Sequence, residues 1–313
     1  MNDNKYVIGV DGGGTSTVAR LADLQGNVIS VAKAGPSNLS TSGPEKCAET
    51  LTGAITDASS QTSVSLDSVR IVVYGTAGAG RKADQDRLHN AILLQWDTLP
   101  GKPASLCVVS DADIALEAAH GGEPGIIIIA GTGSIMYGRD TDGTIKRSGG
   151  WGPVIGDPGS GNAIGLQALR VAAKTIDGCI KPGLLMQLIA EHTGITSQEV
   201  LINKVYKEKF PPSEITPLVF QAAAKGDQSA LDIVNQSAKE LIDMLTCGLK
   251  KFSFTDVVPI SYVGGVLHSD TMYPDIVSKM IREEVPNADI REPKFKPEEG
   301  AVAMALRLLQ EDK

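Results

Sequence analysis

Apolar positions at the start of the chain predict a small antiparallel sheet. Residues 6–10 form a continuous apolar run, which is typical of a buried strand, and a glycine-rich turn follows it. Residues 17–24 and 28–32 then carry alternating apolar positions on either side of Gln25-Gly26-Asn27. We therefore expect a three-stranded antiparallel meander.

Further apolar runs are separated by segments with helical spacing. The runs cover residues 69–74 and 105–110, and the helical patterns cover residues 43–60 and 84–94. Continuous apolar strands that alternate with helices are typical of parallel strands covered on both faces. The first part of the chain is thus predicted to be of the α/β class.

A similar plan begins again at residue 125. Residues 125–130 form an apolar run, a Gly-Thr-Gly turn follows, and residues 135–139 and 144–147 form a second predicted hairpin. Two copies of one strand–turn–hairpin unit can face each other across a cleft, where a small ligand would be enclosed.

The rest of the chain is predicted to be largely helical. Residues 160–251 carry mostly helical patterns, including a long amphipathic stretch at 229–249. A strand at 260–263 and a terminal helix at 298–309 complete the prediction. The length of 313 residues agrees with two domains.

Composition and charge exclude several classes of function. With 29 Lys and Arg against 37 Asp and Glu, the net charge of −8 repels polyanions, so a bound phosphate must be held by backbone amides or a metal. The 34 Gly against 5 Phe, 2 Trp and 6 Tyr favour a phosphate-cradling backbone over a base-stacking surface. We expect no nucleic-acid partner.

Membrane and cysteine-based functions are also disfavoured. No apolar run approaches the length of a membrane span and no signal-peptide core precedes the first strand, so we expect a cytoplasmic protein with no membrane partner. The four cysteines, Cys47, Cys107, Cys179 and Cys247, lie far apart, and we expect buried free thiols.

Two glycine turns at matching positions are candidate phosphate loops. Asp11-Gly12-Gly13-Gly14-Thr15-Ser16-Thr17 combines glycines that let the backbone approach an oxyanion with hydroxyl donors, and Asp11 can hold Mg²⁺ through water. Gly131-Thr132-Gly133-Ser134 occupies the corresponding place in the second half. The alternative for each is an ordinary glycine turn.

A carboxylate between the two loops is a candidate general base. Asp111 follows the strand at 105–110 and could accept a proton from an attacking hydroxyl, although it could instead cap the next helix. Asp113 lies inside the start of that helix, where it favours the helix dipole.

Three more glycine-rich segments are candidates for ligand contacts. Residues 149–161 combine many backbone amides with Trp151 and Asp157, a set suited to binding a sugar through its hydroxyl groups. The alternative is that Asp157-Pro158 simply begins a helix. Gly264-Gly265 could let a nucleoside lie against the backbone, and residues 75–80 form a loop without an assigned role.

Together these motifs resemble the sugar kinase, actin and Hsp70 superfamily. Within it they resemble the N-acetylglucosamine kinase branch that is grouped with the BadF/BadG/BcrA/BcrD ATPase family. The matching segments occur in the expected order: residues 11–17, 110–112, 131–134, 149–152, 156–157 and 263–265.

The resemblance implies two ribonuclease-H-like, actin-like ATPase domains flanking an interdomain cleft. One comprises residues 1–118 with 297–313, and the other residues 119–296. It implies transfer of the γ-phosphoryl group of ATP, with Mg²⁺ held near Asp11, to the 6-hydroxyl of an amino sugar. N-acetylglucosamine is the first expectation, with N-acetylmuramate, glucosamine and glucose as alternatives, and we expect a homodimer.

The resemblance also assigns the site residues. Asp111 matches the family's catalytic base. The residues that match sugar contacts of the family are Asn38, Asp111, Gly150, Trp151 and Asp157. Pro158 stands where the family usually has glutamate, which leaves the identity of the sugar open. The residues expected at ATP are Asp11, Gly13, Gly14, Thr15, Ser16, Thr17, Thr132, Gly133, Ser134, Gly264 and Gly265.

Two other functions stay open. An ATPase activator of a radical dehydratase would share the BadF-type fold but needs cysteines that hold a cluster between subunits, and the cysteines here are widely separated. A non-catalytic sugar sensor would bring a DNA-binding segment, for which the residues before Tyr6 leave no room.

Overall fold

The structure is a computed structural model that describes residues 5–268 and 270–311. Their contacts form two compact units. The N-terminal unit runs to Pro124 and resumes at Glu292, and the C-terminal unit is Gly125–Arg291. The domain boundaries expected from the resemblance, at 118/119 and 296/297, stay a prediction.

The N-terminal unit is built on a five-stranded sheet in the order β3-β2-β1-β4-β5. β1, β2 and β3 pair antiparallel, which confirms the predicted meander, and β4 and β5 extend the sheet in parallel with β1. The strands are β1 Tyr6–Gly12, β2 Thr17–Asp23, β3 Val28–Ala34, β4 Val69–Thr76 and β5 Leu106–Ser110.

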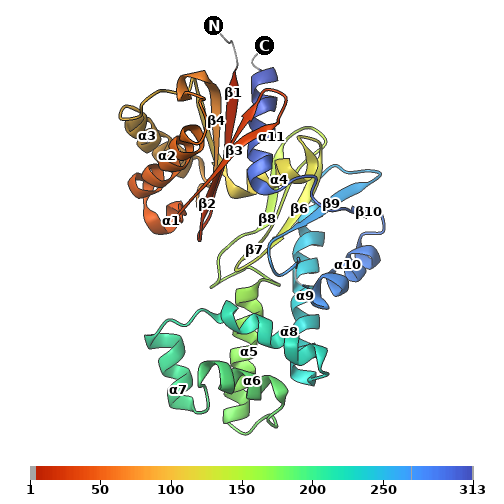
Figure 1. The fold of residues 1–313 in the computed structure, drawn as a ribbon. Helices are drawn as coiled ribbons and strands as arrows, with labels where there is room; N and C mark the ends of the chain where they lie inside the picture. Colours follow the sequence, from red (N-terminus) through yellow and green to blue (C-terminus); the bar gives the residue numbers. More distant parts are fainter. Residues whose placement is uncertain (1–4, 269, 312–313) are drawn as a thin grey trace. The chain divides into compact units, whose positions relative to one another are not determined.

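Helices cover both faces of this sheet, as its apolar strands require. Ile8 and Val10 of β1 pack with α2 and α3, whereas Val7 packs with α4 and α11 on the other face. Figure 1 shows α11 beside β1, although the two come from opposite ends of the chain. The helices are α1 Leu39–Ser42, α2 Pro44–Ser60, η1 Leu66–Ser68, α3 Lys82–Trp96, α4 Asp111–His120 and α11 Pro297–Glu311.

Two glycines permit the close packing of α11. A Cβ added at Gly9 of β1 would lie 2.4 Å from the backbone nitrogen of Val302, and one added at Gly300 would lie 2.2 Å from the carbonyl oxygen of Ile114. These contacts hold α11 between β1 and α4, and α4 begins at Asp111. α11 thus supports α4, the helix whose first residue is the candidate base Asp111.

The C-terminal unit repeats the strand topology of the N-terminal unit. Its sheet has the order β10-β9-β6-β7-β8, in which β6, β7 and β8 form a meander and β9 and β10 are parallel to β6. The predicted repeat of strand, turn and hairpin is therefore confirmed. The strands are β6 Gly125–Ala130, β7 Ser134–Arg139, β8 Ile145–Gly149, β9 Val258–Val263 and β10 Ala288–Ile290.

A helical insertion between β8 and β9 supplies much of the core of this unit. Ile126 and Ile128 of β6 pack with apolar side chains from α5, α8 and α9. Sequence patterns did not predict α10 and β10. The helices are α5 Gly161–Ile176, α6 Leu184–Thr193, α7 Gln198–Ile202, η2 Asn203–Lys207, η3 Pro212–Ile215, α8 Thr216–Ala224, α9 Gln228–Leu249 and α10 Tyr273–Glu284.

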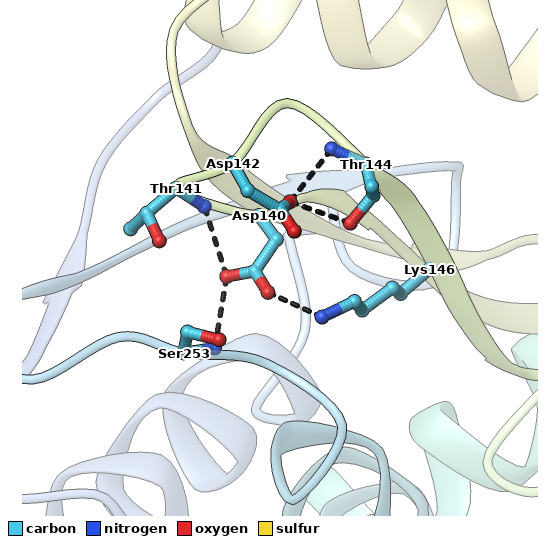
Figure 2. A network of polar contacts seen from close by, with 6 residues as sticks. All are labelled: Asp140, Thr141, Asp142, Thr144, Lys146 and Ser253. Atoms are coloured by element: carbon cyan, nitrogen blue, oxygen red, sulfur yellow. Dashed lines mark hydrogen bonds and ion pairs between the residues drawn. The ribbon is translucent and has the colours of Figure 1, made fainter.

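A buried carboxylate anchors the turn between β7 and β8 (Figure 2). Asp140 is fully buried and accepts hydrogen bonds from the backbone N–H groups of Thr141, at 2.9 Å, and Ser253, at 2.8 Å. Lys146 forms an ion pair with it. Burial by itself raises the pKa of Asp140, but the bonds from Lys146, Ser253 and Thr141 prevail and lower it to about 2. The network ties the hairpin to the segment that follows α9.

The cysteine prediction was partly wrong. Cys47 is buried and Cys107 is half-buried, but Cys179 and Cys247 are exposed, because they lie near the ends of helices rather than on their apolar faces. In the described part of the chain, every helix is too short or too polar to cross a membrane.

Candidate functional site

The first glycine loop, residues 12–17, joins β1 to β2. The backbone N–H of Gly13 donates to the carbonyl oxygen of Ser16 at 2.9 Å. Thr17 is fully buried, and its hydroxyl donates to the carbonyl oxygen of Gly35 at 2.8 Å and lies 2.7 Å from the Ser37 hydroxyl. The buried Thr17 side chain therefore anchors the loop to the segment that follows β3. Gly14, Thr15 and Ser16 are exposed and accessible to a ligand.

Asp11 lies next to this loop, at the end of β1. Burial, together with the negative charges of Glu298 and Asp111, raises its pKa to about 6. Glu298 is itself paired with Arg20, at 2.9 Å. A negative charge on Asp11 is therefore unfavourable in the protein alone, and a bound cation would stabilise it.

Asp111 is the first residue of α4 but does not cap it. The Ser110 hydroxyl accepts from the Asp113 N–H at 3.1 Å, and the Asp113 carboxylate accepts from the Ser110 N–H at 2.9 Å. This capping box shows that the alternative of Asp111 as the cap was wrong.

The Asp111 carboxylate stays accessible to solvent. One of its oxygens accepts from the Ala112 N–H at 3.0 Å. Partial desolvation by the surrounding protein raises its pKa, and the bond from Ala112 opposes this effect. A proton-accepting group with a raised pKa thus lies at the carboxyl end of β5.

Asn38 is positioned by the loop at residues 75–80, which had no assigned role. Asn38 caps α1 by accepting from the Ser40 N–H at 2.9 Å. The Ala77 carbonyl accepts from the Leu39 N–H at 2.9 Å, and the Ala77 N–H donates to the Gly12 carbonyl at 2.8 Å. This loop therefore joins the first glycine loop to the segment that carries Asn38.

The second glycine loop, residues 131–134, is fastened to the start of α5. The N–H groups of Gly161 and Asn162 donate to the carbonyl oxygens of Gly131, at 2.8 Å, and Thr132, at 3.1 Å. Within the loop, the Gly131 N–H donates to the Gly133 carbonyl at 2.9 Å. The positive end of the α5 dipole thus lies next to a glycine-rich turn, an arrangement that favours phosphate.

The tryptophan loop, residues 149–157, leaves Trp151 66% exposed. Asp157, by contrast, is only 6% exposed and accepts from the N–H groups of Gly152, at 3.2 Å, and Ser134. Its pKa is raised by burial, against these bonds. The alternative of Asp157 as the cap of the next helix was wrong, because Ser160 caps α5 by accepting from the Ala163 N–H at 3.2 Å.

A cavity of about 780 Å³ opens beside the second glycine loop, within the C-terminal unit. Gly264, with φ +100°, lies so close to β6 that a Cβ would be 2.5 Å from the Ala130 carbonyl oxygen. This contact places Gly265 at the cavity wall. Sequence reasoning missed the part of the lining that comes from η3 and α8, including Thr216, Phe220 and Gln221, because those residues carry no recognisable motif.

The predicted residues form two groups, each within one unit. The group in the N-terminal unit comprises Asp11, Gly13, Gly14, Thr15, Ser16, Thr17, Asn38 and Asp111. The group in the C-terminal unit comprises Thr132, Gly133, Ser134, Gly150, Trp151, Asp157, Gly264 and Gly265.

Sequence comparison identifies the family. The model of the BadF/BadG/BcrA/BcrD ATPase family matches residues 8–305. The chain belongs to this family. The predicted family and its two-domain α/β fold of the actin-like ATPase type are both confirmed.

Relatives of this BadF/BadG family member include named amino sugar kinases. The chain is 34% identical over 305 residues to the N-acetylmuramic acid/N-acetylglucosamine kinase of Clostridium acetobutylicum. This alignment covers 96% of this chain and 98% of that protein. It is 30% identical over 309 residues to the N-acetyl-D-glucosamine kinase of Dictyostelium discoideum, covering 96% and 97% respectively.

A solved structure extends the comparison to the fold. A protein from Chromobacterium violaceum, proposed to be an N-acetylglucosamine kinase, aligns with a TM-score of 0.77 and 25% identity. The alignment covers 97% of this chain and 99% of that chain.

Proposed function

We propose that this BadF/BadG family member is an ATP-dependent kinase that phosphorylates the 6-hydroxyl of an amino sugar. N-acetylglucosamine is the first candidate for that sugar. The observation that carries the proposal is the position and environment of the Asp111 carboxylate. The carboxylate directly follows the parallel strand β5, is accessible to solvent, is not the helix cap and has a raised pKa. The kinase names of the relatives support the same conclusion.

In this proposal Asp111 acts as the general base. The sugar hydroxyl oxygen forms a bond to the γ-phosphorus of ATP, and the bond between that phosphorus and the bridging oxygen of ADP breaks. The hydroxyl proton passes to the Asp111 carboxylate and from there to solvent. A base whose pKa lies above that of an ordinary carboxylate accepts this proton more readily.

The two glycine loops supply the electrostatic part of the reaction. Exposed Thr15 and Ser16 in the first loop, and exposed Thr132 in the second loop beside the start of α5, offer N–H and hydroxyl donors to phosphate oxygens. Phosphoryl transfer depends mainly on such positioning and charge neutralisation. We assign the nucleoside to the cavity beside Gly265, whose volume of about 780 Å³ suits it.

Mg²⁺ fits the residues around Asp11. Carboxylate oxygens are the ligands that Mg²⁺ prefers, and Asp11 lies in an environment that disfavours an uncompensated negative charge. The ion, when bound with ATP, would neutralise phosphate charge. Asp11 would hold it, directly or through water, and Glu298 would remain engaged with Arg20.

The amino sugar is assigned to Asn38, Trp151 and Gly150. Asn38 uses its side-chain oxygen to cap α1, which leaves its amide group for a sugar hydroxyl. Trp151 presents an exposed aromatic face against which a sugar ring can pack. Pro158 offers no side-chain hydrogen bond, so the choice among amino sugars rests with the other residues.

The test is an ADP-release assay with N-acetylglucosamine, N-acetylmuramate, glucosamine and glucose. We expect sugar-dependent turnover with at least one amino sugar and its loss in Asp111→Asn. Asp57→Asn, an exposed carboxylate on α2, is the matched control and should turn over normally. ADP release that does not depend on sugar, from a protein with an iron–sulfur absorbance, would instead favour the ATPase activator.

A further inference from the structure

A second cavity lies within the C-terminal unit, between α5 and the helix that α7 and η2 form together. Its volume is about 400 Å³, which falls in the range of small-ligand sites. Among the described residues, none lines both this cavity and the cavity beside Gly265. We propose that this second cavity, the α5–α7 cavity, is an effector site for a small organic anion with an apolar body. Its effect on the nucleoside cavity rests on the proposed function, whereas the binding itself does not.

The walls of the α5–α7 cavity are largely apolar. α5 contributes Leu166, Leu169 and Ile176, and the facing helix contributes Leu201 and Val205. All of these side chains except Leu169 are only half-buried, so they leave apolar surface in contact with water. A ligand with an apolar body would bury that surface, which is the main favourable contribution to binding in such a pocket.

The helix that α7 and η2 form is wider than an α-helix at its C-terminal end. In η2 the Glu208 N–H donates to the carbonyl oxygen of Asn203, five residues earlier, at 3.0 Å, which is the pattern of a π-helix. Lys209 follows with φ +53°, in the left-handed region. Turns of this kind are rare and occur frequently at functional sites. Ile202 and Tyr206 of this helix line the cavity and are 45% and 77% exposed, so a ligand would cover them.

Arg170 on α5 gives the cavity a positive charge. Its exposed side chain lines the cavity and forms no ion pair within the part of the chain that the structure describes. A guanidinium binds a carboxylate or sulfonate through charge-assisted hydrogen bonds. Asp177 also lines the cavity, about 10 Å further along the helix axis, and would repel a second acidic group. The charges therefore favour a monoanion whose acidic group lies at Arg170.

A chain of close contacts joins this helix to the nucleoside cavity. The segment that follows η2 packs so tightly on α5 that a Cβ added at Gly165 would lie 1.8 Å from the Pro212 carbonyl oxygen. Further along the same segment, the Thr216 hydroxyl donates to the Gly161 carbonyl oxygen at 2.6 Å, and Thr216 lines the cavity beside Gly265. Because packed interiors transmit displacements, a shift of the α7–η2 helix on ligand binding is expected to reach the nucleoside cavity.

Fluorescence titration of the full chain with anilinonaphthalene sulfonate tests the site. This probe is a monoanion with an apolar ring system, and N-phenylnaphthylamine is the matched neutral probe with the same rings. Ala173→Phe adds a large ring to a residue that lines only the α5–α7 cavity, and it should weaken the binding of both probes at least tenfold. Unchanged binding in Ala173→Phe would overturn the site.

Arg170→Gln separates the charge from the apolar contacts. It should weaken the sulfonate probe about tenfold and leave the neutral probe unchanged. Lys174→Gln is the matched control, because Lys174 is exposed one turn further along α5 but does not line this cavity, and it should change neither affinity. An equal loss of the sulfonate probe in both variants would show general attraction to positive charge and overturn the role of Arg170.

Val154→Ser controls for the neighbouring cavity, which Arg170 also lines. Val154 is 92% exposed in the tryptophan loop, and its apolar side chain belongs to that neighbouring cavity alone. Probe binding should persist in Val154→Ser. A loss of binding there, without a loss in Ala173→Phe, would place the probe at the tryptophan loop and overturn the proposal.

Titration of the sulfonate probe with and without saturating ATP and Mg²⁺ tests the effector role. Coupling should change the Kd of the probe about fivefold, and by reciprocity the probe should change the Kd for ATP by the same factor. An unchanged Kd would overturn the effector role. A protein that binds the probe at this cavity but neither binds ATP nor phosphorylates a sugar would reject the proposed function and keep the site. An active kinase whose probe binding ignores Ala173→Phe would do the reverse.

Discussion

Replacing Asp11 by asparagine should stabilise the N-terminal unit while abolishing the proposed activity. Asp11 is held where burial and the charges of Glu298 and Asp111 raise its pKa from 3.8 to about 6. One pKa unit corresponds to about 1.4 kcal/mol, so ionised Asp11 destabilises the folded unit by up to about 3 kcal/mol in the absence of a cation. Asparagine has the same shape and carries no charge.

The sign of the effect sets its pH dependence. Below about pH 3 Asp11 is protonated in both the folded and the unfolded chain and has no effect. Between about pH 3 and 6 the unfolded chain loses its proton first, so stability falls, and well above pH 6 the full effect is present. Asp11→Asn should therefore gain up to about 3 kcal/mol over the unmodified protein at pH 8 and only a small part of this at pH 4.

Urea unfolding without Mg²⁺ or ATP measures this difference. The chain has two tryptophans, and Trp96 is buried in the N-terminal unit. In a Trp151→Phe background, Trp96 fluorescence therefore reports the unfolding of that unit alone. Asp57→Asn is the control and should show no gain that depends on pH.

Two results would refute the reasoning about Asp11. One is an Asp11→Asn variant no more stable than its parent at pH 8. The other is a gain that is equally large at pH 4, which would show that ionisation of Asp11 is not its cause. The same variant should lose sugar phosphorylation, since the group proposed to hold Mg²⁺ is gone.

Three further predictions concern packing, a buried network and the sugar. Gly9→Ala should destabilise the N-terminal unit by about 3 kcal/mol in urea unfolding, because its methyl group would lie 2.4 Å from the backbone of α11. Gly53→Ala, in α2 with no atom within 4 Å, should instead stabilise it by about 1 kcal/mol, and equal effects would contradict the packing. Asp140→Ala should lower the unfolding free energy of the C-terminal unit by about 3 kcal/mol at pH 7, because the N–H groups of Thr141 and Ser253 lose their acceptor. With the pKa of Asp140 at about 2, its contribution is present above about pH 4 and lost as the pH falls through 2, so the difference should shrink there; a difference that grows on acidification would be inconsistent with the network. Trp151→Ala should raise the KM for the sugar about tenfold and leave the KM for ATP unchanged, and an equal rise in both would contradict the assignment of Trp151 to the sugar.

Local sequence patterns predicted most of the fold because they reflect local physics. The two meanders follow from alternating apolar positions and glycine turns, and they formed with the expected pairing. The pattern did not predict α10 and β10, since a strand of three residues has too little periodicity to recognise. It also did not predict which side of each sheet a helix would cover, because that choice depends on the contacts of distant segments such as α11.

The sequence by itself determined which residues were available for chemistry: two glycine loops, a carboxylate after β5 and a tryptophan in a glycine-rich segment. Only the tertiary structure decided what each side chain does. The side chains of Thr17 and Asp157 are held by groups brought from other segments, which the sequence did not predict. For Asp111 the sequence allowed either a general base or a helix cap, and the structure shows that Ser110 and Asp113 form the cap and leave the Asp111 carboxylate accessible. The physical reason is that hydrogen-bond partners and desolvation arise from the folded neighbourhood of a residue, which the spacing of residues along the chain does not specify.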